Sequence, residues 1–444
     1  MSSPQPDIHF IESYFNLLSS NGIDYGIMRN AEEVATGDAH DIDICIQALR
    51  MQDAENLLSQ QAHHLGWKLH LSTGSPNDRI NIKTYNYYYE DAAKQEIYIV
   101  HIDVFPTFAW KGYELISNNS LLKNLKRDTP YHRISCETES VCNLFIRLLY
   151  NGKIKEKYKS QIYKGFLEGK TGVRKLMNGF LSDKLSDDIY AHVINKNWDI
   201  IENLRNKIVR DIRKHTKRHL LLYLKYLFSK AFNRKGIIIA FQGTDGSGKT
   251  TIIKGIERTL GRTFSNDTLN YYHWRPGFIK SEKRLDTNGN VVSNVQPHTE
   301  CPCNKITSLI KMLVYTVDYI LGYWFKVYRQ AAQGHLVVFD RYYYDFYMDK
   351  ARYRLNIGNW IIRLLHLFIP KPDITFVLLG DAEKIHARKN ELPLEEVQRQ
   401  IDLLRANKRL FASPVVVDVC RSIPEVVYTV SSNILKKLSG QKLG

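Results

Sequence analysis

Apolar residues in the second half of this chain form short β-branched runs that alternate with segments of helical spacing. Residues 236–242 read GIIIAFQ, a run typical of a buried strand, and Ile252, Ile253, Ile256 and Leu260 then recur on one helix face. Further strand-like runs are HLVVF at 335–339, ITFVLL at 374–379 and PVVVDV at 414–419. This order predicts an α/β fold, with a parallel sheet and helices on both of its sides.

A glycine-rich segment separates the first of these strands from its helix. Gly243 to Thr250 read GTDGSGKT, which matches the phosphate-loop pattern G-x-x-x-x-G-K-[ST] at each fixed position. Glycines let the backbone wrap phosphates at a helix N-terminus, while the lysine reaches the β- and γ-phosphates and the hydroxyl binds Mg²⁺. We therefore predict ATP and Mg²⁺ as cofactors. The residues predicted to hold them are Gly243, Gly246, Ser247, Gly248, Lys249, Thr250 and Thr251.

Two later segments carry charges suited to the same site. Asp340 ends a strand and is predicted to bind Mg²⁺ opposite Thr250, with helix capping as the alternative. Arg341 follows where an acceptor or transferred phosphate would lie. Arg388 precedes a helix and is predicted to belong to a lid over the triphosphate, although a solvated surface position is the alternative.

Together these motifs resemble the thymidylate kinase family. The resemblance rests on GTDGSGKTT, on RPG at 275–277, on FDRYYYD and on LGDAEKIHARK, in that order, over residues 236–440. It implies that Asp245 helps to organise the acceptor and the loop, that Arg275 and Arg341 hold the acceptor phosphate, and that Arg388 is a lid arginine. The implied catalytic set is Asp245, Lys249, Arg275, Asp340, Arg341 and Arg388.

The acceptor half of the motif set departs from that family. YYHWRPGF stands where the family usually has T-R-E-P-G-G, the residues after Arg341 read YYYDFYMDKARYR, and an inserted stretch precedes residue 306. These variants also resemble a divergent bacterial set of thymidylate kinase-like proteins linked to surface-polysaccharide genes. A sugar or lipid-linked acceptor therefore stays open beside dTMP.

The first half of the chain carries a different carboxylate motif. Asp41 and Asp43 alternate on a strand-like run, so both point to one face, and Asp103 lies on a later strand. This D-h-D arrangement resembles the polymerase-β-like nucleotidyltransferases and implies a metal site of these three carboxylates, with Arg29 available for phosphate contacts. GIMRN replaces the expected glycine turn, and carboxylates at a solvated strand edge are the alternative reading.

Composition adds a basic connector and a cellular setting. Residues 203–235 hold eleven Lys or Arg against one acid, so they supply +10 of the net charge of +16. Such a stretch suits an anionic membrane surface or nucleic acid, or is a solvated linker. The opening residues MSSPQPDIHF lack a signal-peptide pattern, and the six cysteines show no paired-ligand spacing apart from Cys301 and Cys303, so we expect a cytoplasmic protein, or one peripheral to the inner membrane face.

Four segments and one principal activity follow from these patterns. The predicted segments are a nucleotidyltransferase-like α+β domain at 1–110, a helical extension at 111–202, the connector at 203–235 and the phosphate-loop domain at 236–444. The predicted reaction is Mg²⁺-ATP-dependent phosphoryl transfer to a nucleoside monophosphate such as dTMP. A kinase of sugar or lipid-linked intermediates and a nucleotide-gated nucleic-acid-binding module are the alternatives, and a homodimer is one arrangement open to the chain.

Overall fold

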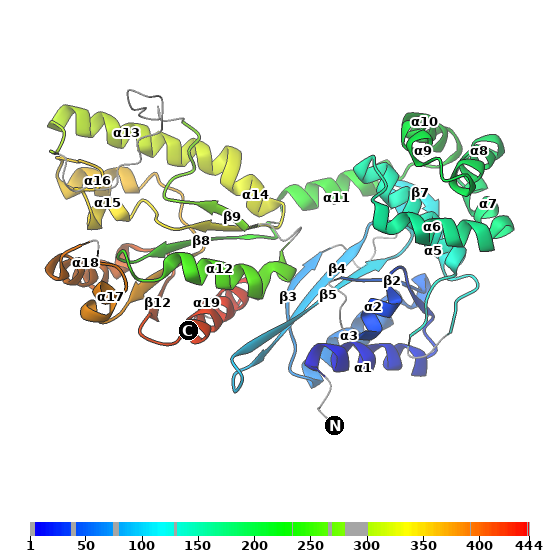
Figure 1. The fold of residues 1–444 in the computed structure, drawn as a ribbon, viewed down its shortest axis with the longest axis horizontal. Helices are drawn as coiled ribbons and strands as arrows, with labels where there is room; N and C mark the ends of the chain where they lie inside the picture. Colours follow the sequence, from blue (N-terminus) through cyan, green and yellow to red (C-terminus); the bar gives the residue numbers. More distant parts are fainter. Residues whose placement is uncertain are drawn as a thin grey trace. The chain divides into compact units, whose positions relative to one another are not determined.

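The computed structural model of the protein describes residues 5–36, 41–73, 80–127, 131–232, 234–264, 269–279, 301–390, 392–441 and 443. Its internal contacts divide the chain into two compact units. The first unit comprises residues 1–89 and 98–229, and the second comprises residues 90–97 and 230–444 (Figure 1). The inserted stretch predicted before residue 306 lies largely outside the described residues, since 280–300 are among those not described.

A mixed five-stranded sheet forms the centre of the first unit, in the order β1-β2-β5-β4-β3. Parallel pairing of β2 with β5 sets Asp43 directly beside Asp103. Because side chains alternate across a strand, Asp43 and Cys45 share one face of β2, whereas Ile42, Ile44 and Ile46 enter the core on the other. The strands of this unit are β1 (Tyr25–Ile27), β2 (Ile42–Ile46), β3 (Lys68–Thr73), β4 (Lys83–Asp91), β5 (Glu96–Phe105), β6 (Phe108–Trp110) and β7 (Tyr113–Ile116).

Helices build two cores around that sheet. One core packs α1 and α3 on the sheet through Phe10, Tyr14 and Leu58, and the other joins the helices of residues 136–215 around Phe145 and Phe180. The predicted helical extension is therefore helical throughout most of its length. The helices are α1 (Pro6–Ser20), α2 (Ala31–Thr36), α3 (Met51–His64), α4 (Asn118–Leu121), α5 (Cys136–Ile146), the π-helical η2 (Arg147–Asn151), α6 (Glu156–Glu168), α7 (Lys170–Asn178), α8 (Asp183–Ile194) and α9 (Trp198–Asn203).

The basic segment 203–235 holds two helices, α10 (Arg205–His215) and α11 (Leu220–Phe232). The side of α10 that carries Ile208 and Ile212 is buried in the core of the helical extension, while its last turn presents Arg213 and Lys214. None of the helices formed by the described residues combines the length and the apolar character needed to cross a bilayer.

The second unit contains the parallel sheet that the apolar runs predicted. Its strands pair in the order β12-β11-β8-β10-β9, and each of the four pairings is parallel. Every residue of β8 and β10 is buried, which explains why both strands read as continuous apolar runs. The strands are β8 (Ile237–Gln242), β9 (Leu269–Tyr272), β10 (Leu336–Phe339), β11 (Ile374–Leu379) and β12 (Pro414–Asp418).

Helices cover both faces of this sheet (Figure 1). α12 and α19 pack against each other on one side, and α13 lies on the other. α13 is only partly buried, since it buries Met312 and Tyr319 and exposes Ile306 and Ile310. The helices are α12 (Lys249–Leu260), α13 (Lys305–Gly322), α14 (Tyr328–Ala332), α15 (Asp345–Met348), α16 (Asn359–His366), α17 (Ala382–Arg388), α18 (Leu394–Ala406) and α19 (Ile423–Leu438).

Candidate active site

The glycine loop between β8 and α12 has the backbone geometry of an anion cradle. Gly246 and Gly248 have φ angles of 84° and 83°, in the left-handed region that disfavours other residues. A Cβ on Gly243 would lie 2.7 Å from the Ser247 Oγ and 3.0 Å from the Leu378 Cβ, so a side chain there would displace its neighbours. The loop ends at Lys249, the first residue of α12, so amide groups at the helix N-terminus face the loop's concave side.

The side chain of Lys249 contacts the backbone of the glycine loop. Its Nζ donates hydrogen bonds of 3.0 Å to the carbonyl oxygens of Gly243 and of Thr244, and the residue is only 7 % exposed. Burial, reinforced by the nearby Arg341 guanidinium, lowers the pKa of Lys249 to about 8. The side chain is thus a poorly solvated cation held where a triphosphate would compensate its charge.

Asp340 lies at the carboxyl end of β10, next to the glycine loop. Its Oδ2 accepts a 2.8 Å hydrogen bond from the Tyr271 hydroxyl and lies 3.8 Å from His273 Nδ1. Its Oδ1 is buried and has no hydrogen-bond partner among the described residues. Burial would raise the pKa of Asp340, but the His273 contact, Lys249 and Tyr271 together hold it below its usual value. Asp340 and Thr250 line one cavity, so an ionised carboxylate and a hydroxyl are available there to a Mg²⁺ ion.

Two arginines meet at the aspartate inside the glycine loop. Arg341 forms an ion pair with Asp245 through Nη2, and the Nη2 of Arg352 lies 2.6 Å from the other oxygen of Asp245. Burial would raise the pKa of Asp245, but Arg341, Lys249 and Arg352 hold it well below its usual range. Arg352 is not among the residues predicted for this site, although it lies in the segment after Arg341 that departs from the family pattern.

Arg275, expected at the acceptor phosphate, lies elsewhere. Its Nη1 is 3.2 Å from Asp318 Oδ2 and donates to the Ile279 carbonyl oxygen, also at 3.2 Å. The guanidinium lies 5.1 Å from the centre of the Trp274 ring, and Arg275 does not line the cavity that holds the other predicted residues. The structure therefore brings together all of the predicted catalytic set except Arg275.

A cavity of 680 Å³ joins these groups, a volume suited to a nucleotide. Arg388, at the end of α17, lines it and donates a 2.9 Å hydrogen bond to the Val419 carbonyl oxygen. The lining also includes the apolar side chains of Ile423 and Val426, which would suit a base. The charged and hydroxyl-bearing lining residues are Asp245, Ser247, Lys249, Thr250, Thr251, Tyr271, His273, Asp340, Arg341, Arg352, Arg388, Lys389 and Arg421.

In the first unit, Asp43 and Asp103 have distinct environments despite their register. Asp43 is 2 % exposed and forms an ion pair with Arg29 through Oδ2, while its Oδ1 is buried and has no partner among the described residues. Asp103 accepts a 2.6 Å hydrogen bond from Thr84 and lies 3.3 Å from His101 Nε2. Within the described ranges, no group of three or more His, Cys, Asp or Glu is arranged to hold a metal ion, so the predicted Asp41, Asp43 and Asp103 site stays a prediction.

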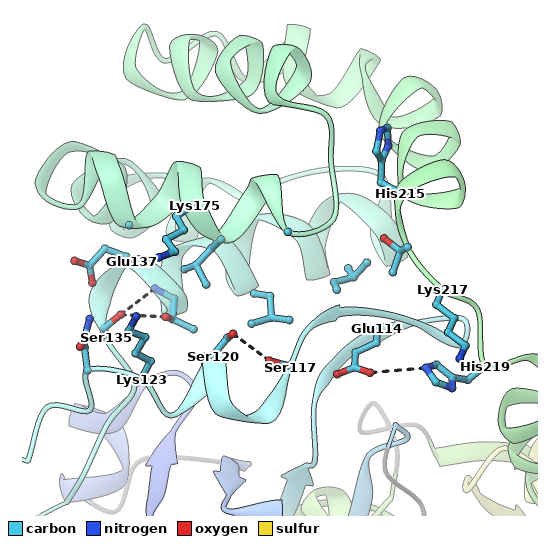
Figure 2. Close-up of a pocket in the computed structure, with 18 residues that line it drawn as sticks. Glu114, Ser117, Ser120, Lys123, Ser135, Glu137, Lys175, His215, Lys217 and His219 are labelled. Carbon is cyan, nitrogen blue, oxygen red and sulfur yellow. Dashed lines mark hydrogen bonds and ion pairs between the residues drawn. The ribbon is translucent and has the colours of Figure 1, made fainter.

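A second cavity, of 540 Å³, lies within the first unit between β7, α5, α7 and the segment after α10 (Figure 2). Lys123, Lys175 and Lys217 stand around it, and Glu137 and Glu114 contribute carboxylates. Glu114 lies 3.8 Å from His219. The lining of this cavity therefore carries charges of both signs.

Comparisons with known proteins agree on the second unit. Residues 241–416 match the family model described as thymidylate kinase. A probable thymidylate kinase of Pyrobaculum aerophilum is 24 % identical over 204 residues, which are 44 % of this chain and 95 % of that protein. Probable thymidylate kinase 2 of Saccharolobus solfataricus is 26 % identical over 176 residues, which are 38 % of this chain and 72 % of that protein.

The thymidylate kinase of Ehrlichia chaffeensis is one similar solved structure, with 19 % identity and a TM-score of 0.30 over 45 % of this chain and 98 % of that one. The residues matched by the family model include the glycine loop, Asp340 and Arg341. The C-terminal half of the chain therefore contains a thymidylate kinase domain.

Proposed function

We propose that the second unit transfers the terminal phosphoryl group of ATP to a nucleoside monophosphate, with dTMP as the first acceptor to test. The observation that carries this proposal is the convergence of Lys249, Asp340 and the Asp245 and Arg341 pair on one cavity at the end of a parallel sheet. The matches to probable thymidylate kinases support a nucleotide acceptor.

Catalysis in this site would rest on positioning and on neutralisation of charge. Lys249 would leave the loop carbonyls to contact the β- and γ-phosphates, and the glycine-loop amides would hold the same phosphates. Thr250 and the free Oδ1 of Asp340 would hold Mg²⁺, which supplies charge neutralisation at the transferred group. Arg341 would lie between donor and acceptor, and Arg388 on the lid side would counter charge that develops at the transferred phosphoryl group.

The test is transfer from labelled ATP, with Mg²⁺, to a panel of nucleoside monophosphates and hexose phosphates. We expect the wild type to transfer label to dTMP or to another nucleoside monophosphate. The Lys249→Met and Asp340→Asn variants should not transfer it. Lys254→Met is the matched control, because Lys254 lies on the same helix as Lys249 and does not line the cavity. Binding of ATP without transfer to any nucleotide would contradict the proposal.

A second proposal concerns a sugar or lipid-linked acceptor, and the position of Arg275 favours testing it. The arginine implied for the acceptor phosphate is engaged by Asp318, so the acceptor side of this site differs from the one the resemblance implies. In the same assay, transfer of label to a hexose phosphate and not to nucleotides would support this alternative.

For the first unit we propose a nucleotidyltransferase-like role. Support comes from Asp43 and Asp103, which lie side by side in register on parallel strands. Equilibrium dialysis with Mn²⁺ and a nucleoside triphosphate tests this role. The proteins compared are Lys249→Met alone and Lys249→Met combined with Asp43→Asn or with Asp103→Asn. Binding that survives both substitutions would contradict it.

A further inference from the structure

Arg341 and Arg352 line the cavity, and each forms an ion pair with an aspartate close to it in the sequence. Nη1 of Arg341 lies 3.3 Å from Asp345, four residues later, and Nε of Arg352 lies 3.1 Å from Asp349, three residues earlier. Both Asp345 and Asp349 are 4 % exposed. Buried carboxylates of this kind fix the direction in which each guanidinium points.

Both guanidinium groups point to the same place. Arg341 and Arg352 contact different oxygens of Asp245, and all three residues line the cavity. A guanidinium group can bind two oxygens of a phosphate monoester in the same bidentate way as it binds those of a carboxylate. Among the described residues, the Arg352 Nη1 makes no hydrogen bond, so this arginine keeps donors for a second anion.

Arg275 is unable to serve that position while it holds Asp318. The Asp318 side chain is completely buried and also accepts hydrogen bonds from the backbone amides of Gly277 and Ile279, at 3.1 and 2.5 Å. Moving Arg275 into the cavity would leave a buried carboxylate without its counter-charge, which is costly. The pair therefore fastens the turn at 275–279 to α13.

We propose that Arg352, together with Arg341, contacts the phosphate of the acceptor and so selects phosphorylated acceptors, in the role that the family resemblance gives to Arg275. This inference rests on the proposed phosphoryl transfer. It assigns to Asp245 a second task, because its carboxylate orients both guanidinium groups toward the point where the acceptor phosphate enters.

The experiment combines steady-state kinetics with calorimetry on the full chain, using Arg352→Met, Arg352→Lys and the exposed Arg363→Met as the matched control. Arg352→Met should raise the KM for dTMP about 10- to 100-fold, the range for a lost charge-assisted contact, and leave the KM for Mg²⁺-ATP within about 3-fold. The KM for dTMP of Arg352→Lys should lie between those of Arg352→Met and the wild type. Arg363→Met should have the KM of the wild type.

Calorimetry separates a phosphate contact from general damage to the site. Arg352→Met should lower the affinity for dTMP and leave that for thymidine, which lacks the phosphate, unchanged. An unchanged KM for dTMP, or an equal loss of dTMP and thymidine affinity, would overturn the inference. If the wild type transfers phosphate only to hexose phosphates, the proposed nucleotide function fails, and the same comparison between a hexose phosphate and its free sugar decides the role of Arg352. If the wild type binds no phosphorylated acceptor, both proposals fail.

Discussion

Arg275 and Asp318 form an ion pair inside the second unit, with Nη1 of the arginine 3.2 Å from Oδ2 of the aspartate. Asp318 is completely buried, and the Arg275 side chain is 10 % exposed. The pair joins the turn that follows β9 to the long helix α13. The family resemblance implies that Arg275 binds phosphate, whereas in this structure Arg275 has a structural role.

Loss of this arginine should therefore reduce stability more than catalysis. Arg275→Met leaves Asp318 with two backbone donors and no counter-charge, and breaking a buried pair in this way costs roughly 3–5 kcal/mol. Urea unfolding followed by the fluorescence of the second unit's tryptophans measures the change. Removing both charges, in Arg275→Met with Asp318→Leu, should recover part of the loss. A stable Arg275→Met variant with a raised KM for the acceptor would show instead that Arg275 serves the phosphate.

ATP binding should depend on pH through Lys249. Burial and Arg341 lower its pKa to about 8, so above pH 8 a growing fraction of the lysine is neutral before ATP binds. Binding a triphosphate favours the charged form, so affinity should fall as pH rises through 8, with uptake of a proton near that pH. Calorimetry in buffers of different ionisation enthalpy measures the uptake. Lys249→Arg should show no such dependence, because its guanidinium stays charged; proton uptake that persists in this variant would assign it to another group.

The two glycines of the loop that have left-handed backbone conformations should differ in how well they tolerate substitution by alanine. An alanine at either position is strained by a φ angle of 84° or 83°, but only at Gly246 would the new Cβ meet a backbone atom, the Ile385 carbonyl oxygen, at 2.7 Å. At Gly248 no atom lies within 4 Å. Gly246→Ala should therefore lower ATP affinity at least 10-fold more than Gly248→Ala, as measured by calorimetry. Equal losses would mean that backbone strain, and not the contact with α17, controls the loop.

Asp43 should make the stability of the first unit depend on pH. Burial raises its pKa to about 6 despite the opposing charge of Arg29, whereas the unfolded value is close to 3.8. The folded chain then binds the extra proton between these values, so the contribution of Asp43 to stability falls as pH rises from about 4 to 6, by about 3 kcal/mol, and stays level above. The difference in urea unfolding between the wild type and Asp43→Asn, measured from pH 4.5 to 7.5, isolates this contribution. A difference that does not change with pH would contradict the assignment.

Much of the second unit could be read from the sequence because its signals are local. The glycine pattern, the lysine and the following helix lie within a few residues of one another, and backbone conformation at such positions depends on residue type. The apolar runs predicted β8, β10, β11 and β12. Such runs are typical of strands buried on both faces, as β8 and β10 are, whereas alternate residues of β12 are exposed. The short β9, which carries Tyr271 to Asp340, offered no such run.

Tertiary structure alone decided which charged side chains share a site. Arg275 and Arg352 are both arginines near aromatic residues in the sequence, and nothing local distinguishes their roles. Packing of α13 buries Asp318 beside Arg275, whereas the chain after α15 carries Arg352 to Asp245, 107 residues earlier. In the first unit, likewise, the alternation of Asp41 and Asp43 was local, but the pairing of Asp43 with Arg29 depended on how β1 and β2 meet. Long-range ion pairs form where folding brings charges out of water together, so spacing along the chain does not determine them.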